Sequence, residues 1–201
     1  MNRHLFPAAI AVALASAPAA VVHAQASDPA AVQINAFDNT LLEVMRNAKR
    51  LGAHGRFERL QPAIERTFDL AYMTRVAVGS TWSSVSAADQ ASLVRAFSRF
   101  TVATFAHNFD NYSGQHFVLD KVETRGPDKL VVTRIVSPGS SATLAYRMRD
   151  SGGSWKVIDI NYNGTVSSIL GQRSEFASTL RSGGAPALVR KLNGKTDELL
   201  K

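Results

Sequence analysis

The chain has 201 residues and no cysteine, and its 23 Lys and Arg outnumber its 16 Asp and Glu to give a formal charge of +7. The missing cysteine excludes disulfides, Cys-based metal or redox sites and the acylated N-terminal cysteine of a lipoprotein. A chain of this length can build one hydrophobic core without covalent cross-links.

The first residues form the pattern of a secretory signal peptide. Arg3 supplies a positive charge, and residues 5–22 form an apolar run without any charged residue. Small residues end this run and permit cleavage after Ala24 or Ala26. We therefore expect an exported protein.

The expected division of the chain is a signal peptide over residues 1–24 and a single domain over residues 25–201. A retained membrane anchor is the alternative, but Pro7 and Pro18 interrupt the apolar run. No later stretch approaches the roughly 18 to 20 apolar residues that a spanning helix needs. The mature chain is therefore expected to be soluble. For an exported protein, its positive charge favours an anionic membrane surface or an acidic partner over nucleic acid, and improved solubility is an equal alternative.

Helices are expected in the first half of the mature chain, because apolar residues recur there three and four positions apart. The last of them is the clearest, since Ser86 is a candidate N-cap and Asp89 follows it at capping-box spacing. Gly79 suits the end of the helix before it. The expected helices cover about 30–51, 56–68, 70–78 and 87–110.

The pattern then changes to β-branched and alternating residues separated by turns, which predicts an antiparallel meander. In the third strand Leu144, Tyr146 and Met148 are expected to share one face. In the fourth strand Ile158 is expected to share a face with the two apolar residues that follow at alternate positions. The expected strands cover about 117–122, 130–136, 143–149 and 155–162.

Helical periodicity returns near Val166 and is expected to stop at Gly183-Gly184, before a last short helix. Helices on both sides of a run of strands predict the α+β class, with helices packed on one face of a curved antiparallel sheet of about four strands. Such an arrangement can leave an apolar cavity between its layers.

Few residues are candidates for catalysis. His107 and Asp110 are three apart at a helix end, where they could form an acid–base pair, although a histidine there more often interacts with the helix dipole. Asp159 lies within a strand and is expected to pair with an arginine or with backbone N–H groups. No motif for a nucleophile, a nucleotide or a metal is present. We expect no catalytic residue, metal or cofactor.

Several segments, in this order, resemble the MlaC, or toluene-tolerance, family of periplasmic phospholipid carriers. The resemblance covers nearly the whole mature chain. It is carried by residues 72–79, Trp82, 97–100, 155–159, Gly164, 173–176 and 183–184. Within that family the chain is most similar to the hopanoid-associated HpnM branch, on residues 77–79, 82–84 and 109–114. It departs from the family at residues 163–167, where an acid is missing and one residue is added.

The resemblance implies a cavity that holds acyl chains of a phospholipid or a hopanoid-type lipid and leaves the headgroup outside. It also implies that the protein is not an enzyme but an auxiliary component of an ABC transporter. In that role the protein would shuttle lipid between membrane-bound components, with transient contact to the membrane surface. Periodicity cannot separate cavity lining from core. We place the pocket on the Phe-rich helix, the helix before it and one face of the last two strands, at Met73, Val76, Phe97, Phe100, Thr101, Phe105, Leu144, Tyr146, Met148, Ile158, Ile160 and Tyr162.

Two other functions remain open at this point. A small cone-shaped enzyme could use His107 and Asp110, and an interaction module could bind a partner through an exposed apolar face without any ligand.

Overall fold

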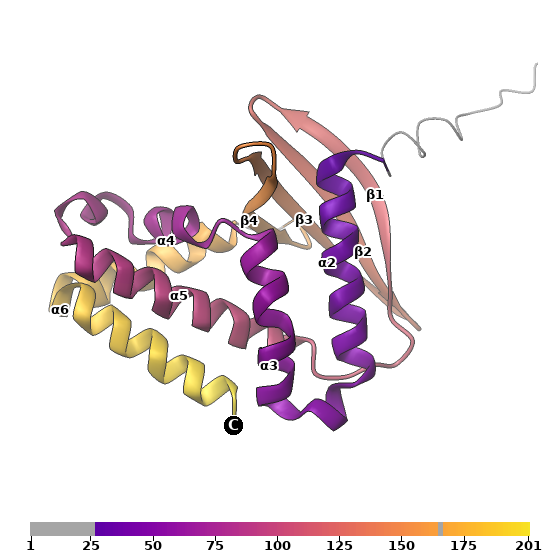
Figure 1. Ribbon diagram of the computed structural model, residues 1–201, viewed down its shortest axis with the longest axis horizontal. Helices are drawn as coiled ribbons and strands as arrows, with labels where there is room; N and C mark the ends of the chain where they lie inside the picture. Colours follow the sequence, from indigo (N-terminus) through magenta and orange to yellow (C-terminus); the bar gives the residue numbers. More distant parts are fainter. Residues whose placement is uncertain (1–26, 165–166) are drawn as a thin grey trace, which may run out of the picture.

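A twisted antiparallel sheet forms one layer of the molecule and helices form the other (Figure 1). The computed structural model describes residues 27–164 and 167–201. The predicted signal peptide lies outside the described residues. The strands follow one another in the order of the chain, as the meander predicted. They are β1 (His116–Arg125), β2 (Asp128–Ser137), β3 (Ser140–Asp150) and β4 (Trp155–Tyr162).

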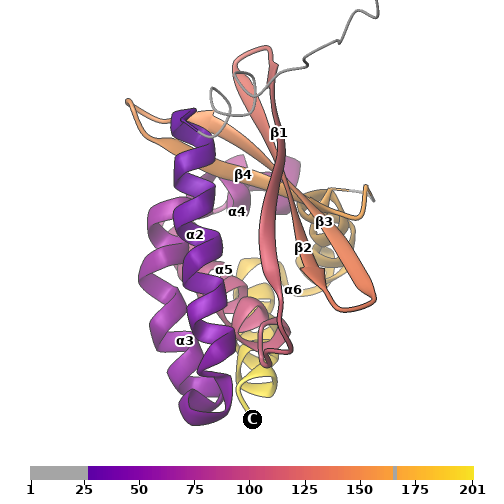
Figure 2. The same cartoon turned by 90° about the vertical axis from the view of Figure 1, so that its right-hand side faces the viewer.

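The helices pack against this sheet through α2, α3, α4 and α6. Figure 2 shows α2 and α3 lying side by side along the sheet, and α5 packs against both α3 and α6. This arrangement confirms the predicted α+β class. The helical elements are α2 (Pro29–Arg46), α3 (Ala48–Thr67), α4 (Leu70–Val78), the 3₁₀ helix η1 (Gly79–Ser84), α5 (Ala87–Asn108) and α6 (Ser168–Leu199).

The predicted first helix is wrong at its C-terminal end. Instead of continuing to Leu51, α2 ends at Arg46, because Asn47 leaves the helical region with φ −103° and ψ 8°. The side chain of Asn47 donates a hydrogen bond to the carbonyl of Glu43 and so satisfies an acceptor at the helix end. Gly52 bends the chain again with φ 64°. These two bends make a sharp elbow between α2 and α3.

The second helix begins at Ala48 instead of near residue 56, but the predicted start of the fourth helix at Ser86 agrees with the structure. The Ser86 hydroxyl accepts a hydrogen bond from the N–H of Asp89 at 3.1 Å and caps α5. Near the C-terminus, the predicted division between two helices at Gly183-Gly184 is present as a kink within α6. The chain bends at Gly184, where φ is 63° and ψ is −163°, and Pro186 restarts the helical path after the bend.

Aromatic rings connect the helices to the sheet in the core. Phe37 of α2 meets Phe68 and Phe105 edge to face, with ring centroids 5.3 and 5.5 Å apart. Phe37 also meets Tyr146 of β3 at 6.4 Å. Edge-to-face pairs add about 0.5–1.5 kcal/mol each beyond the burial of their surface. This cluster therefore fixes how α2 lies on the sheet and how α5 packs against α2.

The predicted alternation in β4 is wrong at Ile158, because the strand contains a bulge. Val157 pairs with Met148 and Asp159 pairs with Arg147, so Ile158 has no partner of its own in the register. Val157 consequently shares the buried face with Ile160. Ile158 instead joins residues that line the opposite side of the sheet.

Gly79 is a position where the fold requires a glycine. It ends α4 with φ 73°, and an added Cβ would lie 2.8 Å from Nε of Arg173. We expect Gly79→Ala to lower the free energy of unfolding by roughly 1–2 kcal/mol, measured by urea denaturation. The matched control is Gly171→Ala in α6, where an added Cβ meets nothing within 4 Å. This substitution should raise the free energy of unfolding, by at most about 1 kcal/mol. Equal effects at both positions would contradict this explanation.

Candidate functional site

A cavity of about 740 Å³ lies between the concave face of the sheet and the helices. Its walls come from distant parts of the chain, because α5 and the start of α6 face β3 and β4 across it. The junction of α3 and α4 is held at the β4 edge, where the N–H of Asp69 donates to the carbonyl of Val157 at 2.9 Å. The cavity is lined by Met45, Phe68, Met73, Thr101, Thr104, Phe105, Asn108, Phe109, Asn111, Gln115, Ile135, Leu144, Tyr146, Ile160, Tyr162, Ser168 and Gln172.

None of these lining side chains carries a charge at neutral pH. Apolar residues form the inner wall, where the rings of Phe105 and Phe109 stack with centroids 5.8 Å apart. Some of the uncharged polar residues lie nearer the solvent, among them Asn108 and Asn111, which are exposed. The hydroxyl of Thr101 and the side-chain oxygen of Gln172 are buried. Thr101 lines the cavity on the same helix as Asn108. The usual rise of a helix places it about 10 Å from Asn108 along the helix axis. The cavity therefore has a mostly apolar interior and a neutral polar rim.

The structure brings seven of the twelve predicted pocket residues together around this cavity. Of the other five, Phe97 packs against Phe176, Phe100 lies under the ammonium group of Lys195, and Met148 is fully buried in the core. Val76 and Ile158 line a groove on the other side of the sheet. The seven that line the cavity are Met73, Thr101, Phe105, Leu144, Tyr146, Ile160 and Tyr162. Their role in holding a ligand stays a prediction.

The pattern of α5 contained a signal for two lining residues that were not predicted. Thr104 lies three positions after Thr101 and Phe109 lies four positions after Phe105, so each shares a helical stripe with a predicted pocket residue. Met45 and Gln172 carry no such signal, because they reach the cavity only through the packing of α2 and α6 against the sheet. Asn111 and Gln115 come from the loop that joins α5 to β1.

A buried carboxyl group lies behind the cavity wall. Asp38 of α2 is only 2% exposed, and one of its oxygens accepts a hydrogen bond from the hydroxyl of Tyr146 at 3.3 Å. Burial raises the pKa of Asp38 to about 8, although the hydrogen bond from Tyr146 opposes this shift. Burial also raises the pKa of the Tyr146 hydroxyl. Both groups are therefore mainly neutral at pH 7, which keeps this wall uncharged.

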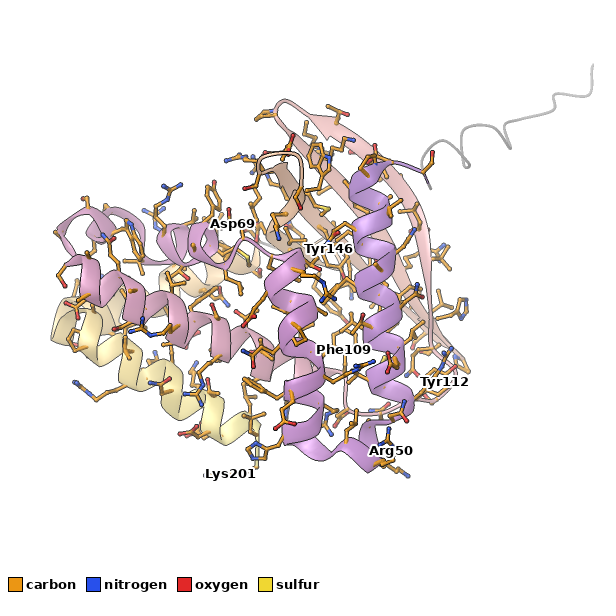
Figure 3. The ribbon with its side chains drawn as sticks, in the orientation of Figure 1. Arg50, Asp69, Phe109, Tyr112, Tyr146 and Lys201 are labelled. Carbon is orange, nitrogen blue, oxygen red and sulfur yellow. The ribbon has the colours of Figure 1, made fainter. Side chains whose placement is uncertain are left out.

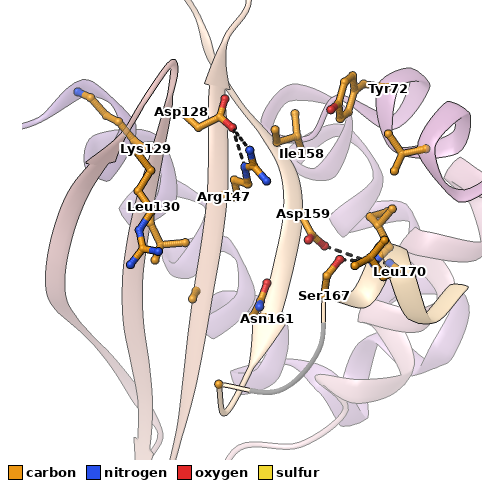
Figure 4. Close-up of a pocket in the computed structure, with 15 residues that line it drawn as sticks. Tyr72, Asp128, Lys129, Leu130, Arg147, Ile158, Asp159, Asn161, Ser167 and Leu170 are labelled. Atoms are coloured by element: carbon orange, nitrogen blue, oxygen red, sulfur yellow. Dashed lines mark hydrogen bonds and ion pairs between the residues drawn. The ribbon is translucent and has the colours of Figure 1, made fainter. Parts of the chain in front are cut away.

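The groove on the opposite face of the sheet, about 610 Å³, has a different chemistry (Figure 4). Asp128 is fully buried there and accepts hydrogen bonds from Nε of Arg149 and Nε of Arg147, each at 2.6 Å. These arginines hold the pKa of Asp128 below its usual value. An acyl chain in this groove would have to remove water from those charges. The concave cavity fits an apolar ligand better.

Asp159 stabilises the start of α6. Its carboxylate accepts hydrogen bonds from the N–H of Ile160 at 2.8 Å and the N–H of Ile169 at 3.3 Å. This confirms the expectation that backbone N–H groups would pair with it. The contact joins β4 to α6 beside the cavity and so helps to place the cavity residues Ser168 and Gln172.

The candidate acid–base pair is not assembled. His107 and Asp110 are both exposed, and Asp110 accepts a hydrogen bond from Asn111 at 2.9 Å. Over residues 27–164 and 167–201, no hydrogen bond or ion pair joins the two side chains, and no group of three potential metal ligands is found. None of the helices in these residues combines the length and apolar character needed to cross a membrane.

Comparisons with known proteins agree with this architecture. Among curated proteins, none matches this sequence. The fold is similar to that of the phospholipid-binding protein from Ralstonia solanacearum, whose structure was solved in complex with a phospholipid. The match has a TM-score of 0.76 at 22% identity and covers 87% of this chain and 100% of that one. A family model described as MlaC protein matches residues 35–194. The chain belongs to the MlaC family.

Proposed function

We propose that this protein is a periplasmic lipid carrier that holds the acyl chains of a phospholipid or a hopanoid-type lipid in the concave cavity. It is exported with residues 1–24 as a signal peptide and passes its lipid between membrane-bound transport components. The observation that carries this proposal is the uncharged cavity of about 740 Å³, whose interior is mostly apolar and whose exposed rim is polar. The phospholipid bound to the similar Ralstonia protein supports the same ligand class.

The physical requirement on such a carrier is strict. Each methylene removed from water contributes about 0.8 kcal/mol, so two acyl chains with about thirty methylenes contribute roughly 24 kcal/mol relative to water. A bilayer offers nearly the same stabilisation. A carrier must therefore surround the chains with a dry apolar wall. A charged wall residue would weaken lipid binding, because covering the charge removes its water. The neutral state of Asp38 behind Tyr146 is consistent with this requirement.

The test is native mass spectrometry of the mature protein purified without detergent, followed by extraction and analysis of the lipid. We expect one phospholipid or hopanoid-type lipid per protein molecule. The extract also identifies the cargo. Phosphorus and fatty esters indicate a phospholipid, whereas a triterpenoid skeleton indicates a hopanoid. A protein whose mass no added lipid shifts would overturn the proposal and favour an interaction module without a ligand.

A further inference from the structure

The elbow between α2 and α3 concentrates positive charge. Arg46, Lys49 and Arg50 lie within five positions of one another, and all three are exposed. The bends at Asn47 and Gly52 make this segment a protruding corner of the molecule (Figure 1).

The three elbow cations differ in their partners from most cations of the sheet. The nearby carboxylate of Glu43 is taken by Arg59 at 2.7 Å, and Arg50 donates to the amide oxygen of Asn47 at 3.1 Å. Within the described part of the chain, none of the three elbow cations has a carboxylate partner. On the sheet, by contrast, Lys121, Arg125, Lys129, Arg134, Arg147 and Arg149 are all paired with acids. The elbow therefore presents charge that no neighbouring acid neutralises.

An exposed aromatic ring completes this corner. Tyr112 is 41% exposed, and the guanidinium group of Arg46 lies 5.3 Å from the centre of its ring. Figure 3 shows Tyr112 and Arg50 at the same corner of the molecule. Arg46 and Tyr112 directly follow Met45 and Asn111, which line the cavity. The basic corner thus lies where two segments of the cavity wall emerge, beside the exposed rim.

We propose that Arg46, Lys49, Arg50 and Tyr112 form the surface with which this protein docks on an anionic membrane. The inference rests on the proposed lipid carriage, because docking here brings the cavity rim close to the bilayer. Each Lys or Arg near an anionic surface strengthens binding about fivefold. A tyrosine suits the headgroup region, since its ring is apolar and its hydroxyl is polar. One exposed ring among cations fits lipid headgroups better than the apolar core of a protein interface.

The experiment measures binding of the mature protein to sedimenting vesicles. One set contains phosphatidylcholine alone, and in the other about a third of the lipid is phosphatidylglycerol. The test variant is Lys49→Glu/Arg50→Glu, whose residues do not line the cavity. The control is Arg181→Glu/Arg190→Glu on α6, which changes exposed arginines and alters the net charge equally.

We expect the wild type to prefer the anionic vesicles. The elbow variant should bind them at least about 30-fold more weakly, and the control less than about 5-fold more weakly. Added salt should reduce these differences because it screens exposed charges. Equal losses in both variants would mean that only net charge matters and would overturn the proposal. Equal binding of the wild type to both vesicle types would also overturn it and would favour an acidic protein partner.

A second measurement separates this inference from the carrier function. Each protein is offered phosphatidylcholine in detergent solution, and retained lipid is counted by native mass spectrometry. The elbow variant should retain lipid as the wild type does, which also verifies that it is folded. A wild type without lipid that still prefers anionic vesicles would contradict carriage and not the docking surface.

Discussion

Replacing Asp38 by Asn is expected to stabilise the folded protein increasingly as the pH rises above about 4, because the folded state no longer has to keep protonated a carboxyl group that the unfolded chain ionises. Its pKa is about 8 in the folded protein and 3.8 for a free side chain. Between these values the folded state holds a proton that the unfolded state has released, so the free energy of unfolding falls as pH rises. The loss is about 1.4 kcal/mol per pH unit and levels off above the folded pKa. Below pH 4 both states are protonated and this contribution disappears.

The measurement is urea denaturation of both proteins at several pH values from 4.5 to 8.5, an interval set by the two pKa values. Asn is close in shape to a protonated carboxyl group and can still accept the hydrogen bond from Tyr146. The variant should match the wild type near pH 4.5 and exceed it by roughly 4 kcal/mol near pH 8.5. Asp110→Asn, in an exposed loop, is the control and should change stability by less than about 0.5 kcal/mol throughout. If the Asp38 variant lost as much stability between pH 4.5 and 8.5 as the wild type does, Asp38 would not be the group responsible for this pH dependence.

Replacing Ile135 by Asp is expected to abolish lipid retention while the protein stays folded. Ile135 lines the cavity and is only half-buried, so without lipid a carboxylate there can be hydrated. An acyl chain that covers it would remove this water and provide no hydrogen-bond donor. The resulting cost of roughly 3 kcal/mol or more corresponds to at least about 100-fold weaker binding.

The neighbouring residue of the same strand provides the matched control. Val136 is also half-buried, but alternation along β2 directs it to the opposite face, outside the cavity. Val136→Asp should therefore retain lipid in native mass spectra. Its free energy of unfolding should match that of the Ile135 variant within about 1 kcal/mol. Loss of lipid from both variants, or from neither, would argue against a ligand in the concave cavity.

Local patterns were enough to predict the elements of this fold. The N-cap at Ser86, the end of α4 at Gly79 and the four strands were predicted correctly, because capping, turn residues and periodicity depend on neighbours in the chain. The order of these elements implied the α+β class, and the family resemblance also came from the sequence. The predicted faces included both cavity residues of β3, Leu144 and Tyr146. On α5 they included only Thr101 and Phe105.

The errors occurred where a local pattern meets an irregularity. The bulge at Ile158 shifts the alternation of β4 by one residue, and the break at Asn47 shortens the first helix. Neither has a strong signal, since a bulge is selected by the strand beside it and the α2–α3 elbow by packing of the two helices. Phe97 and Met148 lie on apolar faces that close completely, so they became core and not cavity wall.

The sequence by itself determined the export signal pattern, most of the secondary structure, the fold class and the family. Only the tertiary structure decided which apolar residues enclose a cavity, because a void depends on how two distant faces fit together. It also decided the chemistry of groups that meet across the chain. Asp38 and Tyr146 are 108 positions apart, and burial between α2 and β3 is what raises the pKa of the carboxyl group. In the same way, Arg46 and Tyr112 join one basic corner only because α2 and the α5–β1 loop end side by side.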